Sequence, residues 1–330
     1  MLIEELNKLL LDATNGSRAS LSKLITILER GDQSVSWSLV DNLKHSFRDS
    51  YIVGFVGPPG AGKSTLLGKI VKKFTEKNSD ERIAVLTVDP TSPLSGGSFM
   101  GNRIRMIDDI KGKTNQIFVR SFSAKQSVGG LTVQVYFASK LLSLAGYKNL
   151  FIEGVGAGHL DIKPILYSHT RIAVLTPTSG DIIQMLKAGV MELCDIYIIN
   201  RADEGNPSFV KSQLEETIRL RAQNGGWIPP VLTTVAREDR GIDMVYDAIL
   251  QHKKHLIVSG DYEKRIKEMA LTEVKDIFMT EVNVCLEDFI QRNDALIHKY
   301  IEKDNRKSEI ISYVVQEVAR EIFRRWNGQC

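Results

Sequence analysis

Seven short apolar runs alternate with amphipathic stretches over residues 51–235 of this 330-residue chain. Most runs are apolar at successive positions, so both faces of the strands that they predict would be buried. Such strands, separated by helices, are typical of an α/β fold with a mainly parallel sheet and helices on both faces. Ligands bind beyond the carboxyl ends of strands in these sheets, so the informative residues should follow each run. The predicted strands span 51–56, 82–88, 116–122, 149–155, 171–177, 195–200 and 229–235.

Helical patterns precede this central region. Apolar residues at three- and four-residue spacing predict short helices over residues 2–13 and 19–31, and a third around 36–48. We expect these helices to pack on the main domain through their apolar stripes, as a collar. The pattern therefore predicts an N-terminal helical segment, 1–49, and a central domain, 50–256.

A C-terminal helical extension, 257–330, follows the last predicted strand. Two long helices rich in Glu, Lys and Arg are predicted over 260–302 and 306–326. Two helices cannot easily bury an apolar stripe by themselves, so the extension either folds back or pairs with a second copy of the chain. We favour pairing, which predicts a homodimer.

The composition is ordinary for a globular protein and argues against several partners. Lys and Arg number 43 and Asp and Glu 40, so a net charge of +3 gives no sign of nucleic-acid or membrane binding. No apolar stretch approaches the ~20 residues that cross a bilayer, and the acidic start is unlike a signal peptide. Three scattered cysteines, Cys194, Cys285 and Cys330, fit a reducing compartment. We expect a cytoplasmic protein.

A complete phosphate-binding motif, G-x-x-x-x-G-K-[ST], follows the first predicted strand. Its glycines allow consecutive backbone N–H groups to converge on phosphate oxygens, at the amino end of the next helix. Lys63 should reach the β- and γ-phosphates, and Ser64 should bind Mg²⁺, which prefers oxygen ligands. The motif consists of Gly57, Pro58, Pro59, Gly60, Ala61, Gly62, Lys63 and Ser64.

Two acidic residues end predicted strands where a metal site would need them. Asp89 follows the second strand, and Glu153 ends the fourth, before Gly154 and Gly156. Carboxylates there can hold Mg²⁺ through its water shell, and the glycines let backbone N–H groups approach the γ-phosphate. Acids in such positions are also common as helix caps. Beside a phosphate loop we favour the metal role for both, with Lys63, Asp89 and Glu153 as the catalytic candidates.

The stretch Asn200-Arg201-Ala202-Asp203 follows the sixth predicted strand and suggests a choice of base. A carboxylate at Asp203 can accept two hydrogen bonds from guanine that adenine cannot donate, and loss of such a paired contact discriminates strongly. Asn200 would brace the loop and reach the other edge of the base. Arg201 departs from the usual NKxD pattern, although its planar guanidinium can also stack on a base. A weaker candidate for a backbone contact to the base is Thr234-Val235-Ala236.

In their order and spacing these stretches resemble the ArgK/MeaB family of P-loop GTPases along essentially the whole chain. The resemblance rests on GPPGAGKST, VDPTSPLSGGSFMGNRIRM, EGVGAGH, SGDIIQMLKAGVMELCD and NRAD. The resemblance implies that residues 50–256 form a P-loop GTPase domain that binds GTP or GDP with Mg²⁺. It also implies a homodimeric chaperone of an adenosylcobalamin-dependent acyl-CoA mutase, typically methylmalonyl-CoA mutase, whose cofactor loading it gates and which it protects from inactivation.

The same resemblance assigns residues by position. Thr65 joins Lys63 and Ser64 in the phosphate loop. Asp89 and 90–103 match a first switch, Glu153 to Asp161 a second, and Gly180 through Lys187 a third mobile segment that couples nucleotide to partner. Loops held by γ-phosphate and Mg²⁺ in one state and released in the other would form a bistable element.

The chain also departs from the family pattern. The family commonly has ETVGVGQSE where this chain has EGVGAGHLD, so Gly154 replaces Thr and His159 replaces Gln. His159 is a candidate for positioning water, although a lone loop histidine is more often a bystander. Arg103 and Arg105 are candidates for a catalytic arginine, or plain helix-surface charges. With Arg201, these changes indicate a divergent branch.

We expect GTP hydrolysis by water, with Mg²⁺ and Lys63 neutralising the phosphates. One alternative is a metal-insertion GTPase, which needs clustered soft ligands, whereas the six histidines and three cysteines are dispersed. A second is a dimeric scaffold that binds nucleotide without hydrolysing it. A protein kinase is a weaker third, because no HRD-type catalytic loop is present.

Overall fold

A computed structural model describes most of the chain in two parts. The described residues are 3–30, 50–90, 116–124, 130–154, 163–177, 180, 192–221, 226–293, 295, 298 and 307–327. The predicted helix at 36–48, most of the three switch segments, and the candidates Arg103, Arg105 and His159 lie outside these residues.

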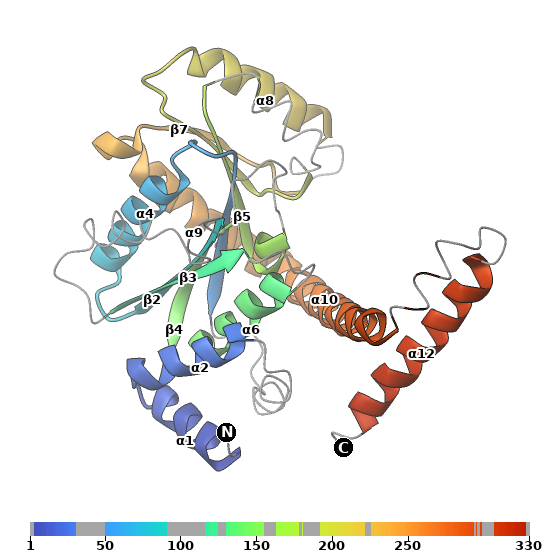
Figure 1. The fold of residues 1–330 in the computed structure, drawn as a ribbon. Coiled ribbons are helices and arrows are strands. Elements are labelled where there is room, and N and C mark those ends of the chain that lie inside the picture. Colours follow the sequence, from blue (N-terminus) through green and yellow to red (C-terminus); the bar gives the residue numbers. More distant parts are fainter. Residues whose placement is uncertain are drawn as a thin grey trace. The chain divides into compact units, whose positions relative to one another are not determined.

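The centre is a seven-stranded sheet in the order β3-β2-β4-β1-β5-β6-β7, in which every pair of neighbours is parallel (Figure 1). The predicted α/β class is confirmed, and each predicted run corresponds to one strand. The strands are β1 Tyr51–Val56, β2 Arg82–Pro90, β3 Ile117–Ala124, β4 Tyr147–Glu153, β5 Thr170–Leu175, β6 Ile196–Asn200 and β7 Val231–Thr234.

The helices cover both faces of this sheet because alternate strand residues point to opposite sides. On one face, Val53 and Phe55 of β1 belong to the same buried cluster as apolar residues of α4 and α9. On the other face, Val56 lies in a cluster with residues of α8 and η2. The helices are α1 Ile3–Thr14, α2 Arg18–Arg30, α4 Lys63–Lys77, α6 Gly130–Leu144, α8 Pro207–Arg221, α9 Ile242–Ser259, α10 Asp261–Arg292 and α12 Lys307–Asn327, with short 3₁₀ helices η2 Lys163–Tyr167 and η4 Ala236–Glu238.

The predicted N-terminal collar packs on the sheet edge that β3 forms. Ser17 begins α2 as its N-cap, since the Ser20 N–H donates to the Ser17 hydroxyl at 3.2 Å. Arg120 of β3 pairs with Glu29 of α2. Arg18 donates to the carbonyl of Ile117 at 2.7 Å. The collar thereby satisfies polar groups of an edge strand that would otherwise be open.

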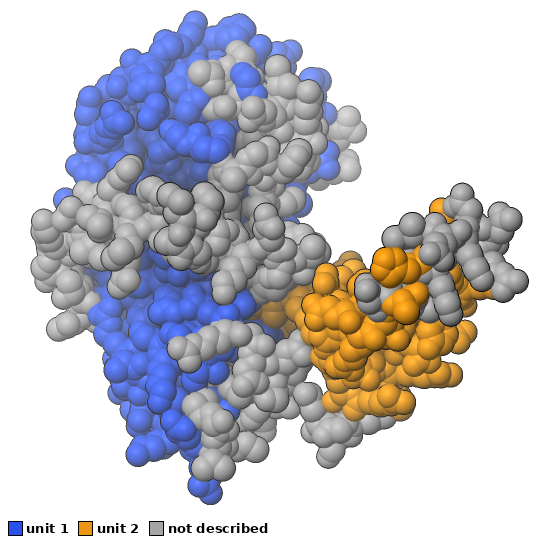
Figure 2. Space-filling model, in the orientation of Figure 1, with its two compact units in different colours: residues 1–125, 134–270 blue, residues 126–133, 271–330 orange. Residues whose placement is uncertain are grey.

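The chain forms two compact units, shown in different colours in Figure 2. Unit 1 consists of residues 1–125 and 134–270, and unit 2 of residues 126–133 and 271–330. Helix α10 is continuous across residue 270. In unit 2, α10 packs on α12 through Phe289 and Tyr313, whose ring centroids are 6.1 Å apart, and through an Arg325–Asp288 ion pair of 2.5 Å.

One predicted helix is interrupted. The pattern predicted a helix over 260–302, but α10 ends at Arg292, Asn293 is not helical, and the described residues 295 and 298 are helical again. The Asn293 side chain donates to the carbonyl of Phe289 at 2.9 Å, and its backbone N–H donates to Ile290 at 3.1 Å. Asparagine competes with the helix backbone in this way and favours helix ends. None of the helices in the described ranges is long and apolar enough to span a bilayer.

The first turns of α10 belong to unit 1. The ring of Tyr262 stacks on buried His169, with centroids 4.9 Å apart. Arg265 donates to Asp195 at 2.9 Å, and the side chains of Arg265 and Asp195 are only 14% and 11% exposed. These contacts attach residues 261–270 to the sheet, whereas the domain boundary expected from sequence lay at 257.

We therefore predict that a chain ending at residue 270 is more stable than one ending at 257. The shorter chain loses Arg265 and leaves the Asp195 carboxylate buried without its cation, which costs about 3–5 kcal/mol. Its melting temperature should fall by roughly 10 °C relative to the longer chain, as measured by circular dichroism. Equal melting temperatures would show that residues 261–270 contribute little to unit 1.

Candidate nucleotide-binding site

The predicted phosphate loop connects the central strand β1 to helix α4. Gly60 and Gly62 have φ angles of 79° and 83°, in the left-handed region that favours glycine. A Cβ atom at Gly57 would collide with the carbonyl oxygen of Val174 in β5, so only glycine fits there. The loop therefore turns tightly between β1 and β5 and leads into the amino end of α4, where N–H groups lack intrahelical acceptors.

Lys63, the first residue of α4, lies folded over this loop. Its ammonium donates to the carbonyls of Gly57 at 2.9 Å and Pro58 at 3.1 Å, and its side chain is buried. Burial lowers the pKa of Lys63, and the charge of Glu153 opposes that shift. The contacts hold the ammonium above the loop, where the predicted phosphates would lie.

Ser64 and Glu153 meet beside Lys63. The Ser64 hydroxyl donates to the Glu153 carboxylate at 2.6 Å, and Glu153 is buried at the end of β4. This adjacent hydroxyl and carboxylate form an oxygen donor pair that fits the ligand preference of Mg²⁺. The N–H of Gly154 donates to Phe55 at 2.9 Å, so this amide is used within the sheet. A backbone N–H that binds the γ-phosphate would therefore have to come from a residue other than Gly154.

The backbone of Asp89 lies on the neighbouring strand. Thr87 of β2 is in register with Glu153 of β4, so Asp89 lies two residues further toward the carboxyl edge. Its side chain is outside what the structure describes. The metal role assigned to it from sequence therefore stays a prediction.

Asn200, the last residue of β6, joins three segments of the site. Its amide nitrogen donates to the carbonyl of Ala61 in the phosphate loop at 2.8 Å. Its amide oxygen accepts from the Thr234 hydroxyl at 3.0 Å and from the Ala236 N–H at 3.1 Å. The side chain is buried, so each contact replaces a hydrogen bond to water that it cannot make. The phosphate loop and the two segments predicted to bind the base are thus held together by one side chain.

The turn after Asn200 presents the remaining base candidates. Arg201 has φ 58°, which is unusual for a residue with a side chain, and its guanidinium lies 3.5 Å from Glu204. The Ala202 N–H donates to the carbonyl of Thr234 at 3.0 Å, which fixes the turn. The Asp203 side chain is exposed beyond this turn. Thr234, Val235 and Ala236 are buried alongside.

Two residues that sequence reasoning missed also support the base segment. Lys69 of α4 forms an ion pair with Asp239 at 3.2 Å. Asp239 has φ 57° and is the C-cap of η4, the 3₁₀ helix that begins at Ala236. Neither residue lies in a recognisable motif, and their encounter depends on the packing of α4 against η4.

Replacing Asn200 with alanine should weaken nucleotide binding. Three buried hydrogen bonds are lost, and the two segments that they join become independent, so we expect about a 100-fold higher Kd for GDP by calorimetry. Asn206→Ala is a matched control, because the Asn206 side chain accepts from the Phe209 N–H at the exposed start of α8 and bonds to neither the phosphate loop nor the β7 segment among the described residues. An Asn200→Ala affinity equal to that of the control would contradict the bridging role.

Comparisons with known proteins agree with this geometry. Residues 21–289 match the family model described as methylmalonyl Co-A mutase-associated GTPase MeaB. A Pyrococcus horikoshii protein named as a GTPase is 33% identical over 306 residues, covering 92% of this chain and 93% of the relative. The GTPase ArgK of Escherichia coli is 32% identical over 252 residues, covering 74% and 75%.

Two further matches extend the comparison. The mitochondrial methylmalonic aciduria type A homolog of Caenorhabditis elegans is 29% identical over 294 residues, covering 83% of this chain and 73% of the relative. The crystal structure of an LAO/AO transport system kinase superposes with a TM-score of 0.68 at 23% identity, covering 98% and 99% of the two chains, which supports the fold. The phosphate loop, the Asn200 bridge and these matches together identify the chain as a member of the MeaB family of P-loop GTPases.

Proposed function

We propose that this GTPase acts as a chaperone of an adenosylcobalamin-dependent acyl-CoA mutase of the methylmalonyl-CoA mutase type. In this role it gates loading of the mutase cofactor and protects the mutase from inactivation. The matched family description, which names association with methylmalonyl-CoA mutase, supports the choice of partner. The observation that best supports nucleotide binding is the Asn200 side chain, which joins the phosphate loop to the segment predicted to bind the base.

The chemistry that we infer is attack of water on the γ-phosphate, without a covalent intermediate. Lys63 and the amino end of α4 neutralise and orient the phosphates. Ser64, Glu153 and Asp89 are the residues that would hold Mg²⁺. When bound, that ion would neutralise charge on the phosphate oxygens. With only positioning and electrostatics supplied by the chain, intrinsic turnover should be slow and should rise with a partner.

Recognition of guanine is assigned to Asp203. Its exposed carboxylate lies on a turn that is fixed to the base segment by the contact from Ala202 to Thr234. Arg201, on the same turn, pairs with Glu204 and would have to leave it to stack on a base.

An Asp203→Asn variant tests this assignment. The amide loses one of two acceptors for guanine, so GTP affinity should fall by about 100-fold while affinity for xanthosine triphosphate improves. Calorimetry with both nucleotides measures the change. Glu216→Gln, an acid-to-amide change at an exposed position of α8, should leave both affinities within about threefold. An unchanged base preference in Asp203→Asn would remove the guanine assignment.

The homodimer is proposed to form through unit 2. Apolar side chains of both its helices are exposed in the single chain, which is unusual for a monomer of this size. They include Leu271, Val274, Phe278, Met279, Ile311, Tyr313, Val315 and Phe323.

Sedimentation with and without a purified methylmalonyl-CoA mutase tests the partner and the dimer together. Alone, the 37.0 kDa chain should sediment as a dimer, and with the mutase it should move to a larger complex. GTP turnover in the same mixture should rise by at least about tenfold. An unrelated acyl-CoA enzyme is the control. Absence of a complex, with GTP binding intact, would reject the chaperone role but leave the GTPase in place.

A further inference from the structure

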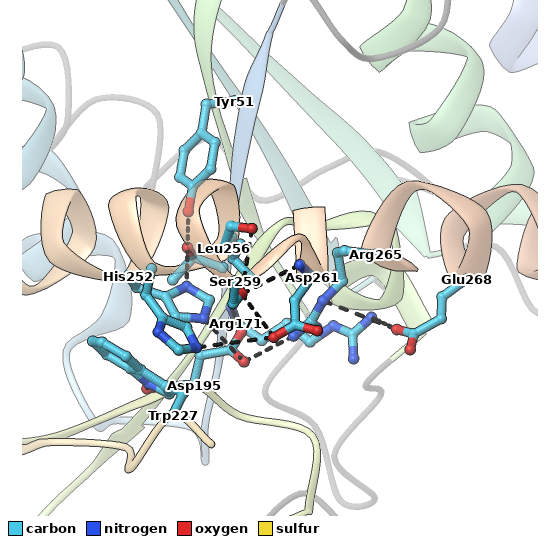
Figure 3. A network of polar contacts seen from close by, with 12 residues as sticks. Tyr51, Arg171, Asp195, Trp227, His252, Leu256, Ser259, Asp261, Arg265 and Glu268 are labelled. Carbon is cyan, nitrogen blue, oxygen red and sulfur yellow. Dashed lines mark hydrogen bonds and ion pairs between the residues drawn. The ribbon is translucent and has the colours of Figure 1, made fainter. Parts of the chain in front are cut away.

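A buried cluster of charged and aromatic residues lies at the amino ends of β1, β5 and β6, around Asp195 (Figure 3). The two oxygens of Asp195 accept from Arg265 of α10 at 2.9 Å and from the backbone N–H of Arg171 at 2.8 Å. Its backbone N–H donates to Arg171 at 2.8 Å, and its carbonyl accepts from the Trp227 indole at 2.7 Å. Asp195 is therefore one of the points at which α10 is attached to the sheet.

Aromatic and imidazole rings complete this attachment. His169 is stacked between Tyr51 of β1 and Tyr262 of α10, with centroid distances of 5.2 and 4.9 Å. His252 lies 3.5 Å from Asp195 and 2.7 Å from the Thr170 hydroxyl. Burial lowers the pKa of His169 to about 3 and that of His252 to about 4, so both rings are neutral near pH 7.

Several hydrogen-bond donors in the cluster around Asp195 lack an acceptor in the described part of the chain. Nδ1 of His169 accepts from the Ile52 N–H at 3.0 Å, so the neutral ring carries its proton on Nε2. That Nε2, Nε of Arg171 and Nη1 of Arg265 are buried and have no hydrogen-bond acceptor in the described part of the chain. Buried donors without acceptors favour any arrangement that exposes them to water. The contact between Arg265 and Asp195 opposes such an opening.

The same three strands reach the nucleotide site at their other ends. β1 leads directly into Gly57, and Val174 of β5 lies against that glycine. β6 begins directly after Asp195 and ends at Asn200, which binds the phosphate loop. At about 3.3 Å per residue, each strand joins the two ends over less than roughly 20 Å. Asp195 and Asn200 therefore lie at the two ends of one short strand.

We propose that the Asp195–Arg265 contact is a latch that couples the nucleotide site to helix α10 and, through that continuous helix, to unit 2. The nucleotide that loosens the latch frees the first turns of α10, and a partner that displaces α10 changes nucleotide affinity by the same factor, as linkage requires. The inference concerns the GTPase alone and does not depend on the identity of its partner.

Hydrogen exchange of the full chain tests the latch with GDP and with a non-hydrolysable GTP imido analogue, both with magnesium. In the wild type, amides of residues 261–292 should exchange at rates that differ by at least about fivefold between the two nucleotides. In Arg265→Met this difference should shrink to less than about twofold, while GDP affinity stays within about threefold. Lys264→Met is the matched control, because the neighbouring Lys264 side chain is 75% exposed and pairs with Asp261 at 2.6 Å, so this variant should behave as wild type.

Several results would overturn the proposal. These are a wild type without a nucleotide-dependent difference, an Arg265→Met variant that keeps the full difference, or a Lys264→Met control that loses it equally. If Arg265→Met shows no cooperative melting, Asp195→Asn takes its place. This variant keeps an acceptor for the Arg171 N–H but removes the charge that holds Arg265. An undiminished difference in Asp195→Asn would reject the latch, and a reduced one would support it.

Discussion

The nucleotide site depends on the side chain of Asn200. Its amide bonds to Ala61 of the phosphate loop and, at the same time, to Thr234 and Ala236 at the end of β7. Because the group is buried, its hydrogen bonds face no competition from water, and loss of one leaves a polar atom unsatisfied. These contacts hold the phosphate-binding turn beside the turn that is predicted to bind the base.

The parallel sheet allows such a bridge because it brings all its carboxyl ends to one edge. Lys63 and Ser64 of α4, Glu153 of β4 and Asn200 of β6 meet where β1, β4 and β6 end. The opposite side of the sheet, where the strands begin, holds a different set of residues. There the amino ends of β1, β5 and β6 enclose Asp195, Arg171 and two neutral histidines, and they hold the start of α10. The sheet thus has a nucleotide-binding edge and an edge that anchors the C-terminal helix.

Membership of the MeaB family accounts for the motifs, and the departures from its pattern have physical consequences. Arg201 keeps a left-handed backbone despite its large side chain, held by the turn from Ala202 to Thr234. Its guanidinium is paired with Glu204. Stacking of Arg201 on a bound base would compete with this ion pair, and a side chain of different length or shape would compete differently. Gly154 has no side chain, and its N–H is committed to Phe55.

The sequence by itself determined the α/β class, the seven strands, the phosphate loop and the order of the nucleotide motifs. These features depend on spacing within a few residues, where apolar periodicity and glycine placement act directly. The tertiary structure decided which distant residues meet. Asn200 and Ala61 are 139 positions apart, and Arg265 and Asp195 are 70 apart, and neither pair leaves a local pattern. Likewise, the periodicity that predicted one helix to residue 302 did not reveal the break at Asn293, whose side chain donates to the carbonyl of Phe289. Strand order and helix packing bring such side chains together, and these depend on burial over the whole chain.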